Sequence, residues 1–278
     1  MKKALKICAG LLLGAAMFVS CSDDEDESAS VYANLPASVG TNPFSGKTWK
    51  KSSTTLAFTD SKMTQKSSST ETVYNYTYNT EKNALYCGYV SVTASGKTIS
   101  SIDDYVNAQK SLRDSSVWND DMASYYRDEA TAHYKNVEAY GYTLSSDGKT
   151  LVLKYGYFPG SLPSSSEFQM TTSSSSYKVE YDDTELNLWD SSSNKFRLFP
   201  SFSGNSFSGT VYQKVDGYWN KKIGTVSGTY SATGEGTSDC TLKIKFTSLP
   251  SALSNIPTNT EISLTQASGS STTYTLSE

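Results

Sequence analysis

Residues able to perform acid–base or metal chemistry are sparse in this chain of 278 residues. His133 is the single histidine, it falls in a segment with helical spacing, and the sequence has no G-x-S-x-G nucleophile motif. Adjacent aspartates could serve acid–base catalysis or bind calcium, but two such pairs lie at expected helix starts, where carboxylates favour the helix dipole. Calcium also needs oxygen ligands from several segments. We therefore expect no enzyme, cofactor or metal site, and structural roles for His133, on a helix surface or interface, and for Asp103/Asp104, Asp120/Asp121 and Asp182/Asp183.

Cys21 carries the most specific chemical signal. Three lysines open the chain, and an apolar run from Ile7 to Val19 follows them. A basic start, a short apolar stretch and a small residue before a cut describe a secretory signal, too short to span a membrane comfortably. With a cysteine directly after the cut, the segment resembles a bacterial lipoprotein signal. The resemblance implies lipidation of Cys21 (diacylglycerol, palmitate) and a membrane anchor; an ordinary signal peptide with a chance cysteine is the alternative.

The residues after Cys21 bear on location. The residue after Cys21 is Ser22 rather than an aspartate, which argues against retention in the inner membrane. The resemblance therefore implies the outer membrane. The acidic tract from Asp23 to Glu27 resembles the export tags of surface lipoproteins in some double-membraned bacteria. A block of like charges is also typical of an extended, solvated spacer. Surface-exposed and periplasm-facing locations both remain open.

Composition favours a β-rich protein. The chain has 20 tyrosines and 12% aromatic residues, and serine and threonine fill much of the remainder, which suits strands with polar outer faces. The formal net charge is −4, so no basic field favours nucleic acid as a partner. Cys87 and Cys240 could form a disulfide outside the cytoplasm, but two free, buried thiols are slightly favoured.

Alternating patterns predict the strands. Tyr74, Tyr76 and Tyr78 share one face of the strand at 73–78, and a second strand at 84–92 follows a polar break. Runs at 137–144 and 151–157 flank an Asp-Gly pair, which predicts a hairpin with a type I′ turn. Further strands are expected at 54–59 and around Leu242, Ile244 and Phe246, and a final hairpin is expected from 261–265 and 272–276.

One stretch has helical spacing. Ser101, three residues before Asp104, matches a variant capping box. Ile102, Tyr105, Val106, Gln109 and Leu112 then follow one face of a helix. A second helix is expected at 119–134, with Met122, Tyr125, Tyr126 and Ala130 inward. This helical insertion could cap one end of a sheet or barrel, as a packed insert or as a lid.

A short internal repeat suggests two β modules, because residues 42–47 resemble residues 205–210. The predicted organisation is a signal peptide at 1–20, the lipidated cysteine with an acidic tether at 21–40, a first β module with the helical insert at 41–160, a Ser-rich linker with bridging strands at 161–204, and a second β module at 205–278.

Gly46 and Trp49 open the first module and meandering hairpins follow. This resembles the start of lipocalin-like (calycin) barrels, whose first strand carries a Gly and a Trp that plug one barrel end, although the spacing here is Gly-x-x-Trp. In the second module Tyr212 stands where the Trp would be, after Gly209. The resemblance implies a mainly β fold of antiparallel, lipocalin-like barrels, whose interior could take a small ligand. A packed core without a cavity is the alternative.

Two functions follow as expectations. The first is a non-catalytic envelope lipoprotein that binds a small apolar or amphipathic ligand inside a barrel, with an interior lined by Trp49, Tyr76, Tyr78, Leu153 and Tyr155. The second is a surface adhesin or glycan-binding module, in which exposed tyrosines and Trp189 would stack on sugars. Cross-strand packing in a core is the alternative explanation of the tyrosine stripes, and it is favoured.

Overall fold

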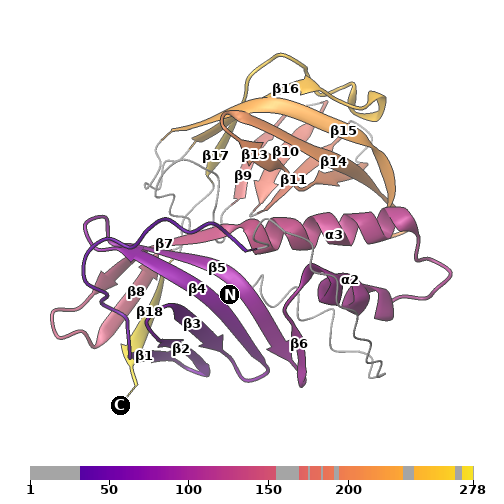
Figure 1. Ribbon diagram of the computed structural model, residues 1–278. Helices are drawn as coiled ribbons and strands as arrows, with labels where there is room; N and C mark the ends of the chain where they lie inside the picture. The colour runs from indigo at the N-terminus through magenta and orange to yellow at the C-terminus, as the bar shows by residue number, and fades with distance from the viewer. Residues whose placement is uncertain are drawn as a thin grey trace.

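A computed structural model describes residues 32–154, 169–174, 176–182, 184–190, 194–233, 241–266 and 271–277. Two antiparallel β-barrels are stacked, with helix α3 (Asp120–Lys135) lying between them (Figure 1). The prediction of a mainly β fold built from barrel modules with a helical insertion is confirmed. Cys21 and the signal segment lie outside the described residues.

The first barrel is a closed ring of eight strands. Its order is β4-β3-β2-β1-β18-β8-β7-β5, and β5 pairs back to β4. The short strand β6 (Lys97–Ile99) extends the sheet beside β5. The eight strands are β1 (Thr48–Lys51), β2 (Thr54–Phe58), β3 (Lys62–Lys66), β4 (Thr70–Asn79), β5 (Ala84–Ala94), β7 (Val137–Leu144), β8 (Thr150–Lys154) and β18 (Ser271–Leu276).

The second barrel is inserted between β8 and β18 of the first. Its order is β12-β11-β10-β9-β17-β16-β15-β14, and two residue pairs between β12 and β14 bring the ring near closure. The 3₁₀ helix η1 (Ser251–Leu253) follows β16. The strands are β9 (Gln169–Ser173), β10 (Lys178–Asp182), β11 (Glu185–Trp189), β12 (Lys195–Leu198), β13 (Ser201–Ser203), β14 (Ser206–Val215), β15 (Tyr218–Thr233), β16 (Thr241–Ser248) and β17 (Ile262–Gln266).

This pairing divides the chain differently from the prediction. The region at 161–204, expected to link two modules, supplies β9 to β13 of the second sheet. The C-terminal strand β18, expected in the second module, pairs with β1 and β8 of the first. β17 and β18 therefore lie in different barrels and do not form the expected hairpin. Alternation predicts each strand, but it does not specify which distant strand becomes its neighbour.

The hairpin at the Asp-Gly pair forms with another turn than expected. Gly148 has φ of +70°, whereas Asp147 is not among the residues with positive φ, so a type I′ turn is excluded. The Gly148 N–H donates to the Ser145 carbonyl at 2.8 Å, as in a type I turn followed by a left-handed glycine. The Asp147 carboxylate accepts from the Ser145 hydroxyl and the Lys149 N–H, and this stabilises the longer loop.

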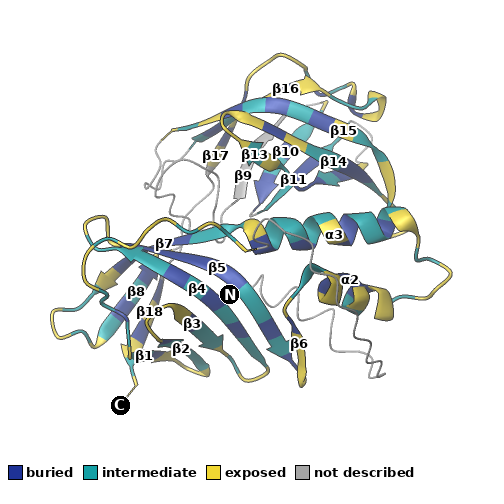
Figure 2. Cartoon of the chain, viewed as in Figure 1, coloured by how far each residue is buried: buried dark blue, intermediate teal, exposed yellow. Residues whose placement is uncertain are grey.

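Both predicted helices form. The Ser101 hydroxyl accepts from the Asp104 N–H at 3.0 Å and caps α2 (Ile102–Ser111), while the Asn119 side chain caps α3. Tyr105, Val106 and Gln109 of α2 are buried, as are the four residues of α3 predicted to face inward. Figure 2 shows buried positions of α3 alternating with more exposed ones between the barrels.

The N-terminal segment 33–39 runs along the outside of the first barrel. Leu35 packs against Ala84, Tyr86 and Ala139 on the outer face of β5 and β7. A Cβ atom added at Gly88 would lie 3.0 Å from the Ala33 Cβ, so this glycine permits the close approach. The segment ends in a parallel bridge between Val39 and Asn79.

Candidate functional site

The residues predicted to line the barrel interior are largely in the first core. Trp49, Tyr76 and Leu153 are buried there, and Tyr78 is half-buried against it. Tyr155 lies outside the described residues. Contact of these residues with a ligand stays a prediction.

One end of the first barrel is filled by aromatic rings. Phe44 stacks on Phe58 at 5.0 Å between ring centroids and meets Tyr142 edge-on at 4.9 Å. Trp49 lies 5.5 Å from Phe58, which lies 5.2 Å from Tyr76. Edge-to-face contacts of this kind stabilise a core beyond the area they bury. Trp49 therefore closes a barrel end, as the lipocalin-like resemblance implies.

The loop before β1 seals this end with hydrogen bonds. The Tyr76 hydroxyl donates to the Thr59 carbonyl at 2.6 Å and accepts from the Asn42 amide at 2.9 Å. The Asn42 side-chain oxygen accepts from the Phe44 N–H at 2.9 Å. Burial raises the pKa of Tyr76, so this hydroxyl stays protonated. Tyr212, by contrast, is buried against α3, where its hydroxyl donates to Asp128, and does not plug the second barrel.

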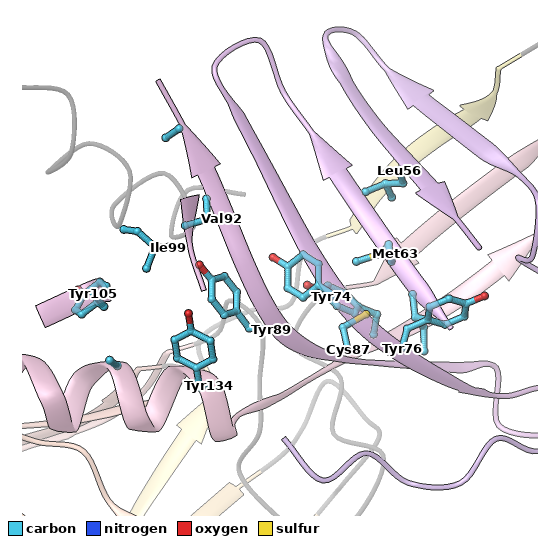
Figure 3. Packing of buried hydrophobic residues seen from close by; sticks show 14 of the residues in the cluster. Leu56, Met63, Tyr74, Tyr76, Cys87, Tyr89, Val92, Ile99, Tyr105 and Tyr134 are labelled. Atoms are coloured by element: carbon cyan, nitrogen blue, oxygen red, sulfur yellow. The ribbon is translucent and has the colours of Figure 1, made fainter. Parts of the chain in front are cut away.

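The tyrosine stripes lie in cores. Figure 3 shows Tyr74, Tyr89 and Tyr134 grouped together, with Tyr76 and Cys87 farther along the strands. Tyr74 is only 4% exposed, so it offers no stacking surface to a sugar. Cys87 is a free, buried thiol whose pKa is raised by burial and by the charge of Glu138, its partner across β5 and β7. Cys240 lies outside the described residues.

A cleft of about 610 Å³ lies between the two barrels, and sequence reasoning missed it. Pockets for drug-sized ligands have volumes of about 300–1,000 Å³. One wall is α3, the second is the outer face of the first barrel with segment 33–39, and the third is one end of the second barrel. The lining residues are Asn34, Leu35, Pro36, Tyr86, Asp128, Thr131, Ala132, Lys135, Asn136, Val137, Tyr181, Thr184, Phe199, Pro200, Ser201, Phe202, Ser208, Gly209 and Thr210.

The walls of this inter-barrel cleft differ in chemistry. Tyr181, Phe199 and Phe202 give the wall from the second barrel an aromatic character, and Phe202 packs on Tyr230 at 4.8 Å. The helix contributes the polar side chains of Asp128, Thr131 and Lys135 instead. A cleft lined by aromatic side chains from one element and polar side chains from another suits an amphipathic molecule.

Asp128 is the carboxylate of the cleft. It accepts from the Tyr212 hydroxyl at 2.7 Å, and the same hydroxyl lies 2.8 Å from the Ser124 hydroxyl. Burial raises the pKa of Asp128, and the hydrogen bond from Tyr212 opposes part of that rise. Asp128 is thus a preoriented hydrogen-bond acceptor, and exposed Lys135 places a cation on the same helix wall.

The acid–base candidates named from sequence do not converge. Asp103 pairs with Arg127 at 2.7 Å, Asp104 lies at the N-terminus of α2, and the Asp121 carboxylate accepts from the Lys222 N–H at 2.9 Å. Asp182 is buried and Asp183 lies outside the described residues. Across the described ranges, no three His, Cys, Asp or Glu side chains gather as a metal site.

His133 lies at an interface between α3 and the first barrel. Its ring is 4.2 Å from that of Tyr89 on β5. The Nε2 atom is buried without a hydrogen-bond partner, and burial lowers the pKa of His133 to about 4. The imidazole is therefore neutral at physiological pH.

The cleft was missed because its residues come from distant segments. Phe199 and Phe202 fall in the stretch interpreted as a linker, and Asp128 and Lys135 lie on a helix interpreted by its apolar face. The polar residues of α3 were the sequence signal that could have indicated the cleft. A helix packed on two sides has few positions in solvent, so polar residues on it can face a cleft instead.

Among the described residues, no helix has the length and apolar character needed to cross a bilayer. In comparisons with known proteins, no family model, curated protein or solved structure matches the chain.

Proposed function

We propose that this protein is a non-catalytic binding protein that holds a small amphipathic ligand in the inter-barrel cleft. The observation that carries the proposal is that aromatic side chains of the second barrel and polar side chains of α3 line the same cleft of about 610 Å³. The cleft is favoured over the first barrel's interior, because rings around Phe44, Trp49 and Phe58 pack against one another at one end of that barrel.

The chemistry of the walls defines the ligand class. The apolar part would lie against Phe199 and Phe202, and a hydroxyl or amine of the polar part would donate to Asp128. An anionic group would be drawn toward Lys135 instead. The scattered carboxylates and the neutral, buried His133 support binding rather than turnover.

The proposal includes a lipid anchor on Cys21 in the outer membrane, with the barrels at the cell surface or facing the periplasm. Its support is the sequence from Lys2 to Glu27. Replacing Cys21 with serine should release the protein from the membrane fraction. Protease treatment of intact cells would then distinguish the two faces of the membrane.

Native mass spectrometry of residues 31–278, purified from the natural host, tests the ligand. A bound small molecule that is lost on denaturation is the expected result. Ser208 is exposed on β14 and lines the cleft, so Ser208→Trp should fill the cleft and remove the adduct. Ser206→Trp is the matched control, because Ser206 is exposed two residues earlier on the same face of β14 and does not line the cleft.

An adduct lost in Ser208→Trp and kept in Ser206→Trp would support the cleft. An adduct kept in both variants would place the ligand elsewhere, including the interior of the first barrel. A clean apo mass for the unmodified protein would count against small-molecule binding.

A further inference from the structure

Three of the four tryptophans lie together, away from the cleft. Trp49 is fully buried in the first barrel, whereas Trp118, Trp189 and Trp219 are half-buried. They come from the loop before α3, from β11 and from β15. Large aromatic side chains that stay partly in solvent are typical of recognition surfaces.

Stacked rings connect two of these tryptophans across α3. Trp118 lies parallel to Tyr126 with 5.9 Å between ring centroids, and Tyr125 lies parallel to Trp219 at 5.6 Å. Tyr125 and Tyr126 meet edge-on at 5.0 Å. The stacking holds the indole rings in fixed orientations before any ligand arrives.

Cations alternate with these rings. The Arg113 guanidinium lies 4.4 Å from the Tyr126 ring, and that of Arg197 lies 4.6 Å from Trp219. Lys195 Nζ lies 5.0 Å from Trp189 and 6.0 Å from Trp219. Such distances are within the range of cation–π attraction.

Most of these charges already have partners. Arg197 forms an ion pair with Glu185 at 2.8 Å and donates to Asn187 and to the Tyr125 hydroxyl. Lys178 lies on β10, next to β11, and its Nζ is 4.5 Å from the Trp189 ring. The same Nζ forms an ion pair with Glu180 at 3.0 Å.

Two cations of this surface lack a carboxylate or hydrogen-bond partner at one atom. Among the described residues, Lys195 Nζ has no carboxylate within ion-pair distance. Partial burial and the charge of Arg197 lower the pKa of Lys195, and the charges of Glu185 and Glu180 oppose that change. Arg113 Nε is buried without a hydrogen-bond acceptor. Asn220 Oδ1, next to Trp219 in the chain, is a buried acceptor that also lacks a partner. Lys195 is a half-buried cation between two indole rings, and this arrangement is suited to an anionic ligand.

We propose that Trp118, Trp189, Trp219 and Lys195 form a binding surface for an acidic oligosaccharide. The C–H face of a pyranose ring packs on an indole, and a carboxylate or sulfate of the sugar binds Lys195 Nζ. This acidic-glycan surface is independent of the inter-barrel cleft, because no residue of the four lines the cleft.

Nucleic acid fits the same rings less well. Nucleic-acid affinity depends on neutralising many phosphates. Arg197 and Lys178 are already paired with carboxylates, so Lys195 is the cation beside Trp189 and Trp219 without such a partner among the described residues. Packing of a sugar ring on an indole needs no further cation, and the test compares the two kinds of polyanion directly.

The test uses sodium polygalacturonate as probe, with its fully methyl-esterified form as the uncharged counterpart. Binding to the protein comprising residues 31–278 is followed by tryptophan fluorescence and by isothermal titration calorimetry. We expect binding of polygalacturonate that weakens with added salt, and at least tenfold weaker binding of the methyl ester.

The variants Trp189→Ala and Lys195→Gln should each weaken polygalacturonate binding at least tenfold. Tyr218→Ala is the matched control: Tyr218 is 39% exposed, and as the neighbour of Trp219 on β15 it points to the other face of the strand. Lys195→Gln changes only a half-buried surface side chain, so its result remains informative even if Trp189→Ala disturbs folding.

Ser208→Trp should bind polygalacturonate normally, which separates this proposal from that for the cleft. Absence of polygalacturonate binding, equal affinity for the methyl ester, or unchanged affinity in Lys195→Gln would overturn the proposal. Tighter binding of an oligothymidylate that competes with polygalacturonate would overturn it in favour of single-stranded nucleic acid.

Discussion

The two barrels have similar strand topology and different interiors. The first is assembled from residues 48–154 and 271–276, and its core cluster contains eleven tyrosines. The second is continuous from residue 169 to 266, and its core contains two tyrosines among mainly aliphatic residues. The first barrel also carries α2 and α3, whereas the second carries only the short η1 among the described helices.

The difference shows how composition determines what a core can do. A buried tyrosine supplies a large apolar ring, and its hydroxyl needs a partner. In the first cluster those hydroxyls bond to groups such as the Thr59 carbonyl, Glu129 and Arg197. Tyr134 keeps a buried hydroxyl without a partner. The second barrel packs apolar side chains with fewer such requirements.

The largest expected effect comes from removing β18. Truncation after residue 270 deletes the strand between β1 and β8, together with buried Tyr274. The first barrel should lose its closed ring and unfold, while the second keeps all its strands. Hydrogen exchange should then show protection in residues 169–266 alone. Deleting only residues 277 and 278 is the control, and retained protection in β1 to β8 of the longer truncation would contradict the prediction.

Trp49→Ala should destabilise the first barrel by about 3–5 kcal/mol, as measured by denaturant unfolding. The reason is that Trp49 is 0% exposed and contacts Phe44 and Phe58. Phe246→Ala is the matched change in the second core. If each variant shifts a separate transition, the barrels unfold independently. A single shared transition would instead show that the barrels are coupled through α3. Residues of α3 belong to the same hydrophobic cluster as Phe199 and Tyr212, which come from the second barrel's part of the chain.

Glu129→Gln should remove a pH-dependent loss of stability. Burial raises the pKa of Glu129 to about 7 from 4.5; the Tyr105 hydrogen bond and the charges of Arg197 and Arg113 oppose the rise, and Glu185 adds to it. The folded state therefore holds the proton more tightly, and stability falls as pH rises from 4.5 to 7.

With about 1.4 kcal/mol per pKa unit, the unmodified protein should lose on the order of 3 kcal/mol across that range. Glutamine can still accept from the Tyr105 hydroxyl, so Glu129→Gln should flatten this part of the profile. Glu261→Gln, at an exposed ion pair with Lys243, is the control. An unchanged slope in Glu129→Gln would refute the assignment.

The effect expected for His133→Leu is similar in size to that of Glu129→Gln and has the opposite sign. The pKa of His133 is lowered by burial to about 4 from 6.5, so the unfolded state binds the proton more tightly and stability falls as pH drops from 6.5 to 4. His133→Leu should reduce this loss by on the order of 3 kcal/mol, by the same conversion. Tyr134→Phe, which removes an unpartnered hydroxyl without a titration in this range, should leave the slope unchanged.

Local patterns in the sequence predicted both helices and most strands of the first barrel, but they gave no ranges for β9 to β15 of the second. The helix cap at Ser101, the alternation of Tyr74 and Tyr76, and the strand around Ile244 all depend on neighbours within a few residues. The type of the turn at Gly148 was predicted wrongly, because the Asp147 side chain stabilises a longer loop through hydrogen bonds to Ser145 and Lys149.

The sequence by itself determined the β class, the two helices and the burial of the tyrosine stripe, because backbone periodicity and hydrophobic patterning act locally. Only the tertiary structure decided that β18 closes the first barrel, that α3 lies between the barrels, and that Asp128 and Phe202 share a cleft. These arrangements depend on pairing and packing between residues far apart in the chain, and several strands with equivalent alternation could have occupied each position.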